Sequence, residues 1–99
     1  MTQRSIVLAI SADNAEALLD GKRRFDHRSV RPKELPARAY LAVSGTASIV
    51  GECTLGEPER KTDKGWALPV SGPRRYRTPR PIAELGLTKV PRSFRYVEK

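Results

Sequence analysis

Residues 21–28 concentrate the side chains of this chain that could do chemistry. They read Gly-Lys-Arg-Arg-Phe-Asp-His-Arg, with four basic residues and one acid around a single Phe that can enter a core. If this stretch is extended, Asp26 and Arg28 lie on one face and Phe25 on the other, because strand side chains alternate. The carboxylate can accept from an exocyclic amine or a ribose hydroxyl, and the guanidinium can hold a phosphate or stack on a base. The alternative is a surface ion pair, which stabilises a fold by only ~0–1 kcal/mol.

A second group of candidate residues surrounds a tyrosine in the Pro- and Arg-rich stretch 72–81. An aromatic ring among arginines is typical of proteins that bind single-stranded nucleic acids. In such proteins, rings stack on bases for ~1–3 kcal/mol each while cationic side chains track the backbone. We therefore expect contacts with RNA or a nucleotide from four consecutive residues, Arg74, Arg75, Tyr76 and Arg77.

The remaining reactive side chains point to no catalytic or metal site. Cys53 is the only cysteine and lies in an alternating apolar stretch, so we expect a buried, inert thiol. His27 is the only histidine. It could act as a base or stack on one, but it shares its side of the strand with Phe25, which favours a partly buried ring. With one His and one Cys we expect no metal site, and nothing indicates a cofactor. The role of Glu52 stays open.

Length and charge restrict the classes of function. A chain of 99 residues has room for one core, so we expect a single domain over 1–99. Nineteen Lys and Arg against eleven Asp and Glu give a net charge of +8, which favours polyanionic partners. No apolar run approaches the ~20 residues of a membrane span, and residues 6–10 are too short for a signal peptide. We expect a cytoplasmic monomer that binds RNA or a nucleotide and no membrane.

The elements that would position these residues are mostly short strands. The pattern predicts strands over 5–10, 39–43, 48–55, 66–70 and 94–97, and an extended stretch over 23–28. Residues 12–20 predict a helix, capped by Ser11 and ended by Gly21. The turn at 44–46 predicts that its flanking strands pair antiparallel. A short helical turn is possible within 82–87. Residues 31–38 predict a loop, and residues 72–81 are rich in Pro and Arg. The fold class is therefore α+β, mostly β.

The order of residues 21–28 resembles the signature of the ASCH domain, a small branch of the PUA-like superfamily. That signature runs Gly, any, Lys, any, any, Glu, any, Arg. Gly21 and Arg28 match it, while Arg23 stands at the Lys position and Asp26 at the Glu position. The segments 10–20, 31–36 and 91–97 also agree. The resemblance implies a small PUA-like mixed β-barrel with one early helix and a cleft beside residues 21–28.

The resemblance also implies where a ligand would bind. Single-stranded RNA or a nucleotide would occupy the cleft between the early helix and the barrel. The floor would be formed by Arg23, Asp26 and Arg28, one side by residues 74–77, and the mouth by Ser44 and Thr46. Turn chemistry explains Ser44 and Thr46 equally well.

The alternative is an enzyme that uses the same cleft, either a nucleoside amidohydrolase of the acetylcytidine type or a ribonuclease. In such amidohydrolases the Lys of the signature is catalytic and a Thr stands at the acid position. Arg23 cannot be deprotonated at working pH, and Asp26 replaces the Thr. We therefore assign no catalytic residue.

Overall fold

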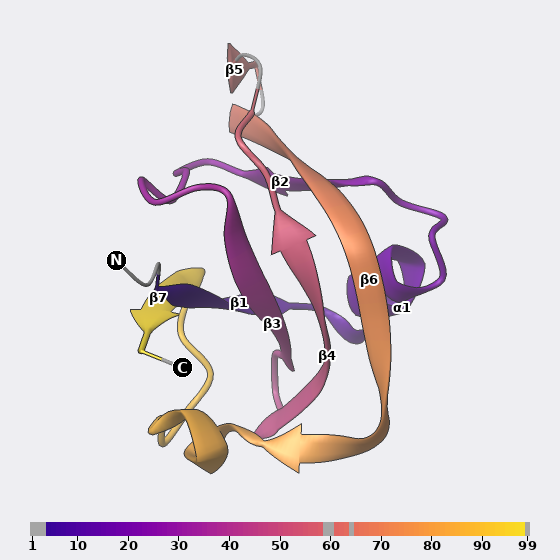
Figure 1. Cartoon of the computed structure of the whole chain (residues 1–99), viewed down its shortest axis with the longest axis vertical. Coiled ribbons are helices and arrows are strands. Elements are labelled where there is room, and N and C mark those ends of the chain that lie inside the picture. Colours follow the sequence, from indigo (N-terminus) through magenta and orange to yellow (C-terminus); the bar gives the residue numbers. More distant parts are fainter. Residues whose placement is uncertain (1–3, 59–60, 64, 99) are drawn as a thin grey trace.

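In the part of the chain that the structure describes, seven strands form one strongly curled sheet with a single α-helix beside it (Figure 1). The computed structural model describes residues 4–58, 61–63 and 65–98, and the following statements concern these residues. The sheet order is β2-β6-β4-β3-β1-β7, with the short β5 paired to β6. The elements are β1 (Ser5–Ile10), α1 (Ala12–Leu19), β2 (Phe25–Arg28), β3 (Ala37–Val43), β4 (Ser48–Leu55), β5 (Lys61–Thr62), β6 (Gly65–Pro81), the 3-10 helix η1 (Ile82–Leu85) and β7 (Phe94–Val97). The predicted mostly-β architecture with one early helix is confirmed.

The first strand and the helix follow the predicted pattern closely. The strand β1 covers the predicted residues, and α1 ends one residue earlier than predicted. Ser11 is the N-cap, since its hydroxyl accepts from the backbone N of Asn14 at 3.2 Å. Gly21 follows the helix with a φ of 77°, the left-handed conformation that glycine adopts without strain. The short 3-10 helix η1 lies in the stretch where a helical turn was possible.

The centre of the sheet is built from β1, β3 and β4. The strands β1 and β3 are parallel, with Leu8 opposite Leu41. The predicted antiparallel pairing of β3 with β4 is confirmed, with Ala39 opposite Cys53, and β3 begins two residues earlier than expected. The strand β7 has the predicted bounds and pairs antiparallel with β1. The sequence pattern therefore located the central strands of the sheet well.

The strand β6 differs most from the prediction. A strand over 66–70 was expected, but Gly65–Pro81 is one long bent strand that pairs first with β2 and then with β4 (Figure 1). Its pairing with β4 shifts register twice. Between Arg75 and Arg80, four residues of β6 stand against a single residue of β4. Extra residues in such bulges need no ladder hydrogen bond, which is why prolines are tolerated there.

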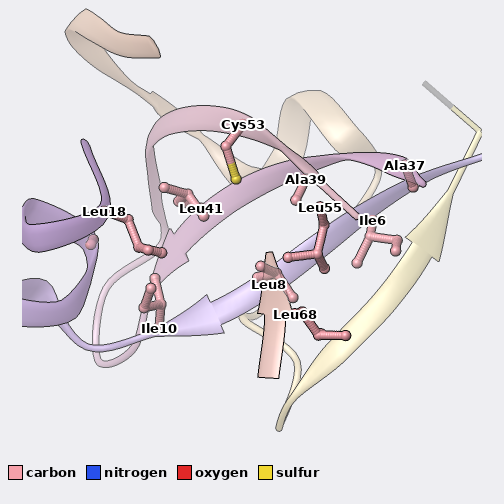
Figure 2. Close-up of a cluster of buried hydrophobic side chains, with 11 residues drawn as sticks. Ile6, Leu8, Ile10, Leu18, Ala37, Ala39, Leu41, Cys53, Leu55 and Leu68 are labelled. Carbon is pink, nitrogen blue, oxygen red and sulfur yellow. The ribbon is translucent and has the colours of Figure 1, made fainter. Parts of the chain in front are cut away.

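Apolar side chains pack on both faces of the sheet. Figure 2 shows the first cluster, which includes Ile6, Leu8, Leu41 and Leu55 from the strands and Leu18 from α1. Cys53 lies in this cluster and is 3% exposed, as predicted for an inert thiol. The second cluster, on the other face, consists of Val7, Ala42, Ile49, Ile82, Leu87 and Val97. The 3-10 helix η1 and the segment that follows it cover this cluster. Apolar packing therefore stabilises both faces of the sheet.

The faces of β2 are opposite to expectation. Phe25 was expected to enter the core, but it is 47% exposed, and His27 is exposed as well. The side chain that turns inward is Asp26, which is buried. The alternation was predicted correctly, and the assignment of its two faces was wrong.

Candidate nucleic-acid interface

Asp26 and Arg28 form a buried ion pair. Arg28 Nε donates to Asp26 Oδ2 at 2.6 Å, and Arg28 Nη2 lies 3.4 Å from Asp26 Oδ1. The two side chains are only 9% and 10% exposed. The two residues share a face, as the spacing predicts. Because both side chains are buried, the pair is not the surface ion pair that was the alternative interpretation.

The other donors of Arg28 are directed at backbone and serine oxygens. Nη2 donates to the carbonyl of Ala9 at 2.8 Å, and Nη1 donates to the carbonyl and hydroxyl of Ser93 at 2.8 and 3.2 Å. With the two contacts to Asp26, the five N–H groups of the guanidinium have five protein contacts. Arg28 thus joins β2 to the end of β1 and to the segment before β7. This polar junction explains why Asp26, and not Phe25, faces inward.

Arg23 does not join this pair. It lies in the exposed turn between α1 and β2, and its backbone N donates to the carbonyl of Ala17 at 3.0 Å. Its side chain has no hydrogen bond or ion pair with the described residues. The expected extended stretch begins only at Phe25. Arg23 is therefore available to a partner, whereas the side chain of Arg28 is buried.

Ser44 and Thr46 lie in the turn between β3 and β4 and form hydrogen bonds that stabilise it. Thr46 Oγ1 donates to the carbonyl of Val43 at 2.8 Å and accepts from the backbone N of Ser48 at 3.1 Å. The backbone N of Ser44 donates to the carbonyl of Ile10 at 2.8 Å. These contacts agree with the turn interpretation. A ligand contact by either residue stays a prediction.

The C-terminal half of β6 forms a strongly basic hollow of about 300 Å³. We call it the β6 arginine hollow; its lining residues are Arg74, Arg75, Tyr76, Arg77, Thr78 and Arg80. Arg75 is neutralised by α1, since its Nη1 lies 2.6 Å from Glu16 Oε1 and its Nη2 2.7 Å from Asp20 Oδ1. The other three arginines form no ion pair with any described residue. The hollow therefore presents uncompensated positive charge.

Tyr76 is held in place within this basic surface. Its hydroxyl donates to Glu52 Oε1 at 3.2 Å, and the guanidinium carbon of Arg80 lies 5.2 Å from the ring centroid. Burial and the adjacent Glu52 carboxylate raise the pKa of Tyr76 to about 12. The hydroxyl therefore stays protonated at neutral pH and acts as a donor. Glu52, whose role was open, orients this ring and also pairs with Arg38 at 3.3 Å.

The predicted site residues fall into separate groups. The hollow brings together the four predicted residues 74–77, and its described lining contains none of Arg23, Asp26, Arg28, Ser44 and Thr46. Sequence reasoning missed Thr78 and Arg80. Arg80 belongs to the same Arg-rich stretch, so the basic composition of that stretch could have identified Arg80 as a candidate. The assignment of a ligand to any of these residues stays a prediction.

Two further observations concern the described residues as a whole. No three His, Cys, Asp or Glu side chains among them are grouped so as to hold a metal ion. Along the same residues, no helix combines the length and the apolar character needed to cross a membrane.

Comparisons with known proteins connect the chain to one fold. Neither the family models nor the curated proteins contain a match. Among solved structures, the crystal structure of ASCH from Zymomonas mobilis superposes with a TM-score of 0.78 at 17% identity, covering 96% of this chain and 88% of that one. A serine-to-alanine mutant of the Zymomonas mobilis protein gives a TM-score of 0.76 at 14% identity over 98% and 90% of the two chains. A tyrosine-to-phenylalanine mutant gives 0.75 at 16% identity over 96% and 91%. The chain therefore has the ASCH domain fold that the order of residues 21–28 predicted.

Proposed function

We propose that this ASCH-fold protein binds single-stranded RNA or a nucleotide through the β6 arginine hollow. The observation that carries the proposal is the set of three arginines, Arg74, Arg77 and Arg80, that have no ion pair with the described residues and line the same hollow as Tyr76. Guanidinium groups bind phosphates in a fork geometry that a lysine cannot reproduce. A net charge of +8 attracts a polyanion to this surface.

The basic surface continues from the hollow toward residues 21–28. Arg75 contacts Asp20, and one glycine, Gly21, separates Asp20 from the basic residues 22–24. The carbonyl of Arg24 accepts from the backbone N of Val70 at 2.8 Å, which keeps this turn beside β6. Arg23 therefore keeps a role in the proposal, as a phosphate contact at the border of the hollow. Asp26 and Arg28 support the site by holding β2 in place.

A single strand suits this surface better than a duplex. Proteins that read duplex DNA place a recognition helix in the major groove. The only α-helix of the described residues has eight residues, and it buries Ala15 and Leu18 against the sheet. Sequence-specific RNA binding instead uses unstacked bases, which rings and guanidinium planes can stack upon. The proposal assigns no catalytic residue.

The proposal is tested by fluorescence anisotropy with a short labelled single-stranded RNA. Arg74→Ala combined with Arg77→Ala should weaken binding by about 2 kcal/mol, or roughly 30-fold, because two charge-assisted contacts are lost. The matched control combines Arg92→Ala with Arg95→Ala, which removes the same charge from exposed residues at the β7 end of the sheet. The control should change affinity by about threefold or less. Equal losses in both double variants would mean diffuse attraction, and no RNA binding by the native protein would refute the proposal.

A further inference from the structure

A second hollow lies next to the β6 arginine hollow. It has a volume of about 240 Å³ and is lined by Tyr40, Ile49, Tyr76, Arg80, Glu84 and Leu85. Tyr76 and Arg80 line both hollows. We infer that this second hollow, which we call the base subsite, receives one nucleobase that carries an exocyclic amino group. The inference rests on the proposed function, because the phosphates of the same strand would contact the β6 arginine hollow.

The walls of the base subsite suit a flat aromatic ring. Ile49 belongs to the second core cluster, and Tyr40, Tyr76 and Leu85 pack against that cluster from the outside. The hollow is smaller than the ~300–1,000 Å³ of pockets that take drug-sized ligands, which suits a single base. Bases stack on such rings whatever their identity, since every base has a π face. The walls therefore provide affinity without selecting a base.

The two tyrosines are held in position by a polar network. Glu52 lies opposite Tyr40 on the neighbouring strand and accepts from the hydroxyl of Tyr76 at 3.2 Å. Arg38 pairs with Glu52 at 3.3 Å and hydrogen-bonds Tyr40. Side chains fixed before a ligand arrives lose less conformational freedom on binding. The network prepares the subsite for a rigid ligand.

Glu84 gives the subsite its selectivity. This exposed residue of η1 is the acid among the lining residues, and it forms no ion pair with the described part of the chain. A carboxylate accepts a hydrogen bond from the N4 amine of cytosine, whereas it repels the O4 carbonyl of uracil. A negative charge beside a phosphate site weakens binding of every strand. The presence of Glu84 beside the phosphate site is explained if its carboxylate rejects a base that lacks the amino group, such as uracil.

Arg80 connects the two hollows. Its guanidinium lies over the Tyr76 ring, 5.2 Å from the centroid, at the border of both. A base in the subsite and the phosphate of the same nucleotide can therefore be bound together. The same chemistry can come from an RNA strand or from a free nucleotide, so the experiment must distinguish these sources.

The experiment compares labelled oligocytidine and oligouridine of equal length by fluorescence anisotropy. The two ligands carry the same charge, so the phosphate contribution cancels in the ratio of their affinities. The native protein should prefer oligocytidine by about tenfold. In Glu84→Gln the ratio should fall to about one, since a glutamine amide can accept from cytosine or donate to uracil. Asp63→Asn is the matched control, because it removes one negative charge from the turn between β5 and β6, at the end of the molecule opposite η1 (Figure 1), and should leave the ratio unchanged.

The outcomes separate this inference from the proposed function. Equal affinity for both oligonucleotides, or a preference that survives Glu84→Gln, overturns the base subsite but leaves RNA binding by the β6 arginine hollow intact. No binding of either oligonucleotide refutes the proposed function itself. Competition by cytidine monophosphate that exceeds that of uridine monophosphate by the same ratio identifies a free nucleotide as a sufficient ligand. A preference for cytosine that is seen only with the oligonucleotides identifies an RNA strand as the required ligand. Both of these results support the subsite.

Discussion

The buried pair of Asp26 and Arg28 shows how a residue pair that suggests ligand chemistry can serve the fold. Arg28 bonds to Asp26, to the carbonyl of Ala9 and to Ser93, so it connects three separate segments. A buried ion pair adds little net stability compared with an apolar replacement. Removing one partner is different, because the other charge then stays buried without compensation. The pair is therefore best tested by changing one partner alone.

We expect Arg28→Ala to lower the free energy of unfolding by about 3–5 kcal/mol, because Asp26 would lose its counter-charge inside the protein. Arg23→Ala, which removes an exposed arginine from the adjacent turn, should change it by no more than about 0.5 kcal/mol. Urea denaturation followed by circular dichroism measures both variants. An Arg28→Ala protein as stable as the native one would show that the junction is dispensable.

Cys53 should make stability fall at alkaline pH. Burial, followed by the charges of Asp26 and Glu52, raises the pKa of the Cys53 thiol from 9.0 to about 12. The unfolded chain therefore loses this proton near pH 9 while the folded protein keeps it. The stabilising contribution is complete below about pH 9 and disappears as pH rises toward 12.

Between about pH 8 and pH 10, the native protein should lose about 1.4 kcal/mol more unfolding free energy than Cys53→Ala, which has no group to titrate. Denaturant unfolding at both pH values measures the difference. Parallel pH profiles would mean that the folded thiol ionises as readily as the unfolded one.

At the scale of elements, the sequence pattern located strands better than it located their partners and faces. The strands at 5–10, 48–55 and 94–97 have the predicted bounds, because their apolar alternation is uninterrupted. The full length of β6 was not predicted, because its prolines interrupt the strand pattern. Pro73 and Pro79 lie where the pairing with β4 shifts register. Such bulges depend on the neighbouring strand, which a local pattern does not contain. The inward face of β2 likewise depends on the carbonyls of Ala9 and Ser93, which come from distant parts of the chain.

Gly51 shows how closely β4, β6 and α1 approach each other. A Cβ at this position would lie 2.6 Å from the carbonyl oxygen of Arg74 and 2.8 Å from Leu19 Cδ2. Gly51→Ala should therefore destabilise the protein by about 1–3 kcal/mol, as overpacked sites do. It should also weaken RNA binding, because the backbone of Arg74 must shift. Denaturant unfolding and RNA anisotropy provide the two measurements.

The control for this variant is Gly45→Ala in the turn between β3 and β4. Gly45 has a φ of 85° and open space where a Cβ would stand, so the substitution costs about 1–2 kcal/mol of backbone strain. It should leave RNA binding unchanged. If Gly51→Ala bound RNA as tightly as Gly45→Ala does, the geometry of β6 at Arg74 would not matter for the ligand.

At the scale of the whole molecule, the distribution of ion pairs defines the candidate interface. Several acids are used by nearby arginines, as in the pairs Arg4–Glu34, Arg31–Glu57, Arg38–Glu52 and Arg75–Glu16. The positive charge that is left uncompensated on β6 lies at Arg74, Arg77 and Arg80. Composition predicted that the segment is basic. Which arginines are free depends on α1 and β4, so the sequence alone could not separate Arg75 from its neighbours or add Tyr40 and Glu84.

The dependence of RNA affinity on salt tests the central claim most directly. If the three free arginines of the hollow and Arg23 each neutralise one phosphate of a single strand, the logarithm of affinity should fall with the logarithm of salt concentration with a slope of about −3. Arg77→Ala should reduce the magnitude of that slope by about 0.7, whereas Arg95→Ala should leave it unchanged. This result would establish binding through the β6 arginine hollow. A native slope near zero, or a slope that Arg77→Ala does not alter, would contradict it.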